Sequence, residues 1–170
     1  MDYFVHAYYG NGVGKTTRTV GLAVRAAGAG KKVMFFQFLK DGSSSEVNVL
    51  RNLPNIDYEC TGTFGFIFDR DPTEEEIDLA SRGIERCLWA TEEGYDLIIA
   101  DEALNALTLG LLREEDIARL ISKKERGVEL VLTGRTCPDK ILELCDYATE
   151  FKMVKHPHER GCEARKGIDC

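Results

Sequence analysis

The sequence lacks several features that would assign it to particular classes of protein. It contains no cluster of Lys and Arg, and its formal net charge is −7 with a pI near 5.1, so we expect no binding to nucleic acid or to an anionic membrane. No apolar run approaches the ~20 residues of a membrane-spanning helix, and the N-terminus has no signal-peptide layout. These absences indicate a cytoplasmic protein that acts on small molecules.

The cysteines and histidines form no recognisable metal-binding or redox motif. The six cysteines include no C-x-x-C pair, which argues against the common zinc and disulfide-exchange sites. We expect free thiols, with Cys87 and Cys145 as small core residues of helices. The segment His156-Pro157-His158 is an isolated H-x-H, which is more typical of a surface than of a metal site.

One stretch dominates what is present, residues 9–17 (YGNGVGKTT). Its glycines let successive backbone N–H groups converge on phosphate oxygens. Lys15 adds a positive charge, and Thr16 is placed to bind Mg²⁺. The stretch is one residue shorter than the usual G-x-x-x-x-G-K-[ST] pattern, because Tyr9 stands where the first glycine belongs. We interpret it as a phosphate-binding loop of unusual geometry; the alternative is a glycine-rich turn without a ligand.

A second stretch, residues 96–102 (DLIIADE), is an apolar strand that ends in two acids and resembles a Walker B strand. A carboxylate at the carboxyl end of a parallel strand, beside a phosphate loop, can bind the same Mg²⁺ ion as Thr16. The alternative is that Asp101 and Glu102 only favour the dipole of a helix that follows them. The nearby glycine loop favours the metal site.

Strands and helices alternate along the chain without an internal repeat. The apolar patterns predict strands at 3–8, 32–38, 56–60, 96–102, 128–133 and 147–154, and helices at 15–28, 46–52, 113–125 and from residues 73 and 138 onward. This order predicts an α/β fold of the P-loop NTPase (RecA-like) type, with a mostly parallel sheet of five to six strands and helices on both faces. The length of 170 residues fits a single domain, residues 1–170.

Two of the helices carry apolar stripes that we expect to face the sheet. The later helix also begins with a capping box, formed by Thr73 and Glu76. The expected buried positions of the two helices are Val20, Ala23, Val24 and Ala27, and Ile77, Ala80, Ile84 and Leu88.

Between these helices, residues 61–72 contain Phe64, Phe66 and Phe68 among turn residues, without a helical period. The pattern indicates either an exposed aromatic loop or a short strand whose phenylalanines alternate toward the core.

The sequence resembles, nearly end to end, the P-loop ATP:corrinoid adenosyltransferases, the family that makes adenosylcobalamin. The resemblance implies transfer of the 5′-deoxyadenosyl group of ATP to the cobalt of cob(I)alamin or a related corrinoid, with release of triphosphate. It rests on GNGVGKTT with its shortened loop, Arg25 in AVRAAG, QFLK at 37–40, the Gly/Phe loop at 62–68, ADEAL at 100–104, TGRTC at 133–137 and the ending VKH…G…A…GID.

The resemblance also implies roles for individual residues. Lys15 and Glu102 would be catalytic, and Mg²⁺ would be held by Thr16 and Glu102 with Asp101 behind them. The family binds ATP along the loop in the reverse sense, which would account for the missing residue. The implied nucleotide-binding residues are Gly10, Asn11, Gly12, Val13, Gly14, Lys15, Thr16, Thr17, Arg25 and Arg135.

On the corrinoid side the sequence departs from the family pattern. The family uses a Phe-x-Trp pair to displace the lower axial ligand of cobalt, whereas Phe66 and Phe68 are the best correspondence here, with one extra residue and no tryptophan. Other members carry an N-terminal extension over the site, while this sequence starts at its first strand, so we expect closure to differ. The resemblance further implies an electron donor such as a reduced flavoprotein, and a homodimer.

Two other functions fit parts of the sequence. A P-loop ATPase or small-molecule kinase would cleave ATP at the γ-phosphate with Glu102 as base. The sequence has no N-K-x-D motif for guanine, and its loop has the wrong length for that class. A non-catalytic carrier would bind the corrinoid and nucleotide without turnover.

Overall fold

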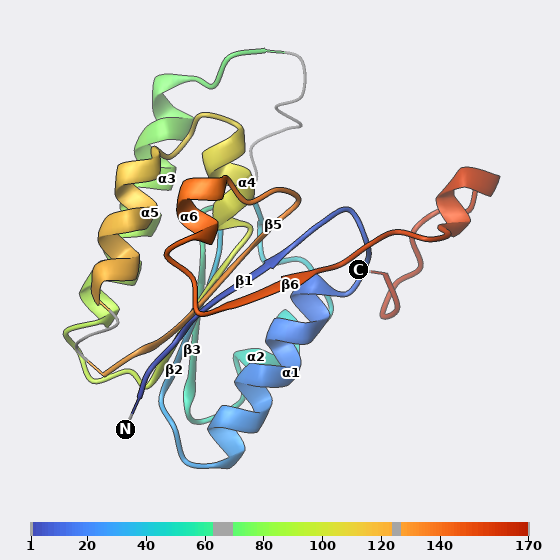
Figure 1. Cartoon of the computed structure of the whole chain (residues 1–170). Coiled ribbons are helices and arrows are strands. Elements are labelled where there is room, and N and C mark those ends of the chain that lie inside the picture. The colour runs from blue at the N-terminus through green and yellow to red at the C-terminus, as the bar shows by residue number, and fades with distance from the viewer. Residues whose placement is uncertain (1, 63–69, 124–126, 170) are drawn as a thin grey trace.

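The computed structural model of the chain describes residues 2–62, 70–123 and 127–169. In these residues a six-stranded parallel sheet forms the centre, in the order β3-β2-β4-β5-β1-β6 (Figure 1). The elements in chain order are β1 (Val5–Tyr9), α1 (Lys15–Gly28), β2 (Val33–Gln37), α2 (Val47–Leu50), β3 (Ile56–Cys60), α3 (Glu74–Ala90), β4 (Leu97–Asp101), α4 (Ala103–Thr108), α5 (Glu114–Ile121), β5 (Glu129–Gly134), α6 (Asp139–Leu142), β6 (Tyr147–Glu150) and the 3₁₀ helix η2 (Pro157–Arg160).

Helices cover both faces of the sheet, which confirms the expected fold class. Helices α1 and α2 lie on one side in Figure 1, and α3 to α6 lie on the other. The residues after β6 extend away from the sheet as an arm (Figure 1). No helix in the described part of the chain is long and apolar enough to cross a membrane.

Two apolar cores form because successive side chains of a strand point to opposite faces. Along β2, Met34 and Phe36 pack into the core under α3 and α5, while Val33 and Phe35 pack into the core under α1. The whole of β2 is buried, as its near-continuous apolar sequence predicts for a strand covered on both sides. Burial of each such side chain contributes roughly 1.5–3 kcal/mol.

Two of the expected core positions are wrong. Val24 is 44% exposed, because the buried stripe of α1 runs through Thr19, Ala23 and Ala26 instead. Ile77 is 39% exposed. In α3 the preceding residue, Glu76, turns inward to complete the predicted capping box with Thr73, so the buried face is shifted by one position there.

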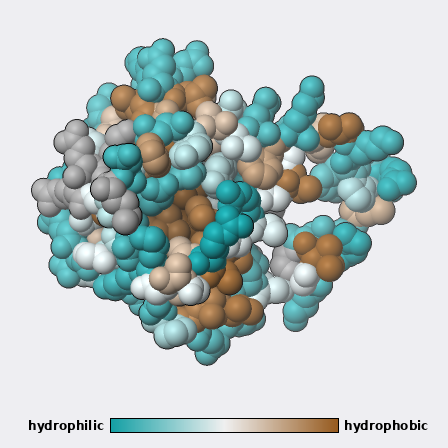
Figure 2. All heavy atoms as spheres, turned by 60° about the horizontal axis from the view of Figure 1, so that its bottom comes forward, coloured by the Kyte–Doolittle hydropathy of each residue, from teal (hydrophilic) through white to brown (hydrophobic). Residues whose placement is uncertain are grey.

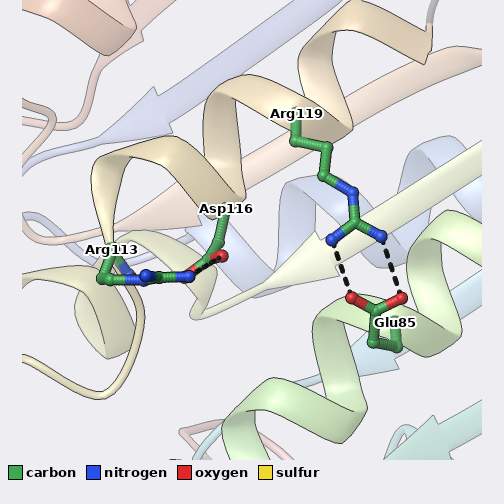
Figure 3. Close-up of polar contacts among 4 residues, drawn as sticks. All are labelled: Glu85, Arg113, Asp116 and Arg119. Carbon is green, nitrogen blue, oxygen red and sulfur yellow. Dashed lines mark hydrogen bonds and ion pairs between the residues drawn. The ribbon is translucent and has the colours of Figure 1, made fainter.

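The outer helices α3 and α5 are also joined by polar contacts on their solvent side. Arg119 of α5 donates two hydrogen bonds to the Glu85 carboxylate of α3, at 2.8 and 3.0 Å (Figure 3). Arg113 donates to Asp116 within the first turn of α5. The Arg119–Glu85 pair is solvent-exposed, so we expect it to contribute no more than about 1 kcal/mol. In the second pair Arg113 is exposed, whereas the Asp116 side chain is only 17% exposed.

A parallel sheet brings the carboxyl ends of all its strands to one edge. The loop after β1, the acids at the end of β4 and Arg135 after β5 therefore meet there, because β1, β5 and β4 are consecutive in the sheet. The loop residues, the two acids and Arg135, which the sequence suggested as functional, therefore lie at this edge.

Candidate functional site

The helix that follows β1 begins without any of the usual caps. Its N-cap residue, Gly14, has φ +105° and no side chain, and the first turn of α1 contains no acid. In contrast, α3 and α5 both begin with three acidic residues; α3 has a capping box, and in α5 the Asp116 carboxylate accepts a hydrogen bond from the Arg113 amide. The first-turn amides of α1 lack acceptors within the helix, so its N-terminus is suited to bind an anion.

The first half of the loop is fixed to the ends of neighbouring strands. The Gly10 amide donates to the Arg135 carbonyl at 3.0 Å, and the Gly12 amide donates to the Phe151 carbonyl at 2.6 Å. A Cβ at Gly12 would lie 2.7 Å from that same Phe151 oxygen, and one at Gly10 would be closer still. Glycine is therefore required here for close packing of the loop on the chain after β6, in addition to any phosphate approach.

Lys15 folds back over the loop. Its ammonium donates to the Gly10 carbonyl at 2.7 Å and to the Gly12 carbonyl at 2.8 Å. Partial burial lowers the pKa of Lys15, and the nearby Arg135 acts in the same direction, while the Glu102 carboxylate opposes them. The lysine is thus held at the mouth of the loop by weak neutral acceptors that a phosphate would replace.

Asp101 lies at the end of β4, with no exposure to solvent, and accepts hydrogen bonds from three side chains. The donors are Thr16 Oγ1 at 3.1 Å, Gln37 Nε2 at 2.9 Å and Thr133 Oγ1 at 2.8 Å. Burial raises the pKa of Asp101, and these hydrogen bonds oppose that shift. The carboxylate is therefore fully engaged in orienting its neighbours.

Glu102 differs from Asp101 in its surroundings and in its backbone. It has φ 63°, a conformation uncommon for a residue with a side chain, and its amide donates to Thr133 Oγ1 at 2.8 Å. Asn105 donates to its carboxylate. Burial raises the pKa of Glu102, and repulsion by Asp101 raises it further. A strained backbone and two crowded carboxylates at one edge are typical of a functional site.

The residues present fit a magnesium ion bound together with a nucleotide. Thr16 and Glu102 offer the hard oxygen donors that Mg²⁺ prefers, and such sites usually take the remaining ligands from phosphates and water. The described residues contain no group of three or more His, Cys, Asp or Glu side chains that could hold a metal without such help.

Most of the other predicted nucleotide-binding residues lie at the same edge. Val13 is exposed on the loop, and Thr17 is exposed in the first turn of α1. Arg135 is exposed beside Lys15. The Asn11 side chain already accepts a hydrogen bond from the Met153 amide at 3.0 Å, which ties the loop to the arm after β6.

The structure does not bring Arg25 to the loop. Ten residues of helix separate it from Lys15, about 15 Å at 1.5 Å per residue. Arg25 lines a separate cavity of about 390 Å³, together with Tyr3, Leu22 and Ala26. This cavity lies at the amino edge of the sheet, because its lining includes residues near the starts of β1, β4 and β5. Figure 2 shows apolar and hydrophilic residues side by side on the surface of the molecule. Phe66 and Phe68, the predicted corrinoid-binding residues, lie outside the described residues.

Comparison with known proteins agrees with this arrangement. A sequence profile of the family described as ATP:corrinoid adenosyltransferase BtuR/CobO/CobP matches residues 2–170. The chain belongs to this family. It is similar to the corrinoid adenosyltransferase of Escherichia coli (strain K12), with 31% identity over 166 residues, 95% of this chain and 83% of that protein. It is 29% identical over 170 residues to the corrinoid adenosyltransferase CobA of Salmonella typhimurium (strain LT2), again 95% of this chain and 83% of that protein.

A solved structure supports the fold of this corrinoid adenosyltransferase. The KaiC-like protein PH0186 from Pyrococcus horikoshii OT3 superposes with a TM-score of 0.52, at 17% identity, over 89% of this chain and 73% of that one. At that identity the likeness concerns the fold alone, which is P-loop NTPase-like as expected.

Sequence reasoning missed three polar residues that organise the site of this adenosyltransferase. Gln37 donates a hydrogen bond to Asp101, and Asn105 donates one to Glu102. The Thr133 hydroxyl donates to Asp101 and accepts from the amide of Glu102. Gln37 is the last residue of β2, and Thr133 is the last but one of β5, in each case after a run of buried apolar residues. A polar residue near the carboxyl end of a buried strand could have indicated such a role from the sequence, because a buried polar group needs a hydrogen-bond partner.

Proposed function

We propose that this chain transfers the 5′-deoxyadenosyl group of ATP to the cobalt of a reduced corrinoid. The observation that carries the proposal is the uncapped start of α1, with Lys15 over it and the acids of β4 beside it, in a chain that belongs to the corrinoid adenosyltransferases. In this reaction the electron pair of Co(I) forms the Co–C5′ bond. The C5′–O bond breaks, and its electrons leave with triphosphate.

The chemistry requires alignment and charge neutralisation more than proton transfer. Co(I) is itself a strong nucleophile, so no general base is needed and the difficult step belongs to the corrinoid. Lys15, Arg135 and the first-turn amides of α1 would bind the phosphates and stabilise charge on the departing oxygen. Mg²⁺, held by Thr16 and Glu102, would neutralise further negative charge on the triphosphate.

The remaining parts of the proposal follow from the family pattern. Phe66 and Phe68 would contact the corrinoid and displace its lower ligand. A reduced flavoprotein would supply the electron that converts Co(II) to Co(I). The active form would be a cytoplasmic homodimer of single-domain chains.

The test is one assay with ATP, Mg²⁺ and chemically reduced cobalamin, followed optically for the Co–C bond, with the phosphate products separated by ion exchange. We expect adenosylcobalamin and triphosphate in equal amounts. Formation of ADP and phosphate instead would support a γ-phosphate hydrolase or kinase. Binding of both substrates without any turnover would support a carrier.

A further inference from the structure

Lys40 follows β2 at the same edge of the sheet as the two acids. Gln37, the last residue of β2, is in register with Asp101, the last residue of β4. Two residues further on, Leu39 adopts φ 58°. Leu39 and Glu102 are the only described residues other than glycine with positive φ, and they lie within two residues of the ends of the adjacent strands β2 and β4. Backbone strain of this kind is concentrated at ligand sites and persists only where the surroundings enforce it.

The strained turn is held firmly in place. The Phe38 amide donates to the Asp101 carbonyl at 2.9 Å, and the Leu39 amide donates to Thr61 Oγ1 at 3.0 Å. Phe38 itself is fully buried. The backbone from which the Lys40 side chain departs is therefore fixed relative to β4 and to its two carboxylates.

Among the described residues, the ammonium of Lys40 has no hydrogen-bonded partner. In the described part of the chain it makes no hydrogen bond and no ion pair within 4 Å, although the residue is partly buried. Other lysines of this chain are engaged: Lys15 with loop carbonyls, Lys31 with Asp96 and Lys140 with Glu114. Lys40 thus differs from these three lysines in having no acceptor among the described residues.

Lys40 follows a strand that lies on the opposite side of the carboxylate pair from the strand that precedes the loop. Strands β2 and β1 lie on either side of the β4–β5 pair in the sheet. Burial raises the pKa values of Asp101 and Glu102, and the positive charge of Lys40 opposes both shifts, as that of Lys15 does for Glu102. The carboxylates thus lie between two lysines that approach from different strands.

We propose that Lys40 is a second phosphate-binding residue, which contacts the phosphate chain of the nucleotide from the β2 side while Lys15 contacts it from the loop. The two carboxylates already offset the charges of Lys15 and Arg135, so a polyphosphate entering this edge needs a further cation besides the metal. An ammonium on a flexible stem and a rigid backbone can turn from the carboxylates to a phosphate. The inference uses the proposed function only to identify the ligand as a nucleotide polyphosphate.

The test measures binding of inorganic tripolyphosphate to the full chain by calorimetry, with Mg²⁺ present. Lys40→Gln should weaken binding about tenfold, equivalent to about 1.4 kcal/mol, while Lys40→Arg should stay within about threefold of the wild type. Lys31→Gln is the matched control, because it removes one positive charge at the opposite edge of the sheet. If Lys40→Gln binds as tightly as the wild type, or loses no more affinity than Lys31→Gln, the proposal is wrong.

A second measurement uses the unaltered protein, so it does not depend on whether a variant folds. Lysine acetylation is followed by mass spectrometry with and without tripolyphosphate. We expect the ligand to slow the labelling of Lys40 about fivefold or more, and to leave Lys31 unchanged; equal labelling rates at Lys40 would overturn the proposal. The outcome is independent of the transferase assay, since a wild type that makes ADP would refute adenosyl transfer and leave the binding result intact.

Discussion

The Thr16 hydroxyl donates to Asp101, with Oγ1 at 3.1 and 3.3 Å from the two carboxylate oxygens. A hydroxyl has one hydrogen to donate and two lone pairs that can accept or bind a cation. Asp101 therefore fixes the hydrogen of Thr16 and leaves its lone pairs available for a metal. Since Asp101 is already engaged with Gln37 and Thr133, Glu102 is the better placed of the two acids to bind that metal directly.

The two acids should consequently respond differently to substitution by their amides. Glu102→Gln removes a charged metal ligand, so we expect the Mg²⁺ concentration for half-maximal rate to rise tenfold or more, with partial recovery of the rate at high Mg²⁺. Asp101→Asn places an NH₂ group among three donors. The resulting unsatisfied contacts should lower the unfolding free energy by about 1–3 kcal/mol, or several degrees in melting temperature.

Magnesium titrations of the rate and thermal melts of both variants check this difference. The assignment of roles fails if Glu102→Gln is the destabilised variant and has unaltered Mg²⁺ dependence.

Lys15→Ala should abolish turnover and leave the fold intact. Among the described residues the lysine donates hydrogen bonds to two loop carbonyls, so its loss should remove little packing but take a full charge away from the phosphates. We expect binding of ATP to weaken at least tenfold, by calorimetry, with a melting temperature within about 2 °C of the wild type. A variant that binds ATP normally, yet melts much earlier, would show that Lys15 stabilises the loop and does not bind the nucleotide.

Glu76 should make the stability of the protein dependent on pH in the acid range. Two hydrogen bonds from Arg70 lower the pKa of Glu76 to about 2, helped by the Thr73 amide. A pKa that is lower in the folded than in the unfolded chain stabilises the fold above the unfolded value of 4.5. That contribution is lost as the pH falls from 4.5 toward 2.

Urea unfolding at pH 7, 4.5 and 3 measures this dependence. Glu76→Gln should lower the unfolding free energy at pH 7 and reduce its decline toward pH 3. Glu85→Gln is the control, because its pair with Arg119 is solvent-exposed (Figure 3) and should change little. An unchanged pH slope in Glu76→Gln would assign the acid sensitivity to other carboxylates.

The sequence was sufficient to predict the fold and the edge of the sheet at which the site lies. Apolar runs and glycine turns are local signals, and topology then brings Thr16 and Asp101 together, although 85 positions separate them. The sequence was insufficient to predict the partners of Gln37, Thr133 and Asn105, because those partners are set by the register between strands and by the turn at Glu102. The family pattern implies that Arg25 assists in nucleotide binding, which stays a prediction; in the structure Arg25 lines the cavity at the amino edge of the sheet.

The sequence and the family pattern predict that Phe66 and Phe68 assist the reduction of cob(II)alamin. The lower axial ligand stabilises Co(II) relative to Co(I), so apolar side chains that displace it raise the reduction potential. A change of about 59 mV in a one-electron couple is a factor of ten, or about 1.4 kcal/mol, which is within reach of one aromatic side chain buried against the corrin ring. Phe66→Ala and Phe68→Ala should therefore spare ATP binding and slow the reduction of cob(II)alamin.

Cobinamide is the control for this prediction, because it lacks the nucleotide that provides the lower ligand. With cobinamide, or with cobalt already reduced to Co(I), both variants should recover much of their activity, since the step that needs the phenylalanines is bypassed. Rates with the three substrates, together with the midpoint potential of bound cob(II)alamin, separate the two explanations. A uniform loss with every substrate, accompanied by a lower melting temperature and an unchanged potential, would show that Phe66 and Phe68 are core residues and that another segment contacts the corrinoid.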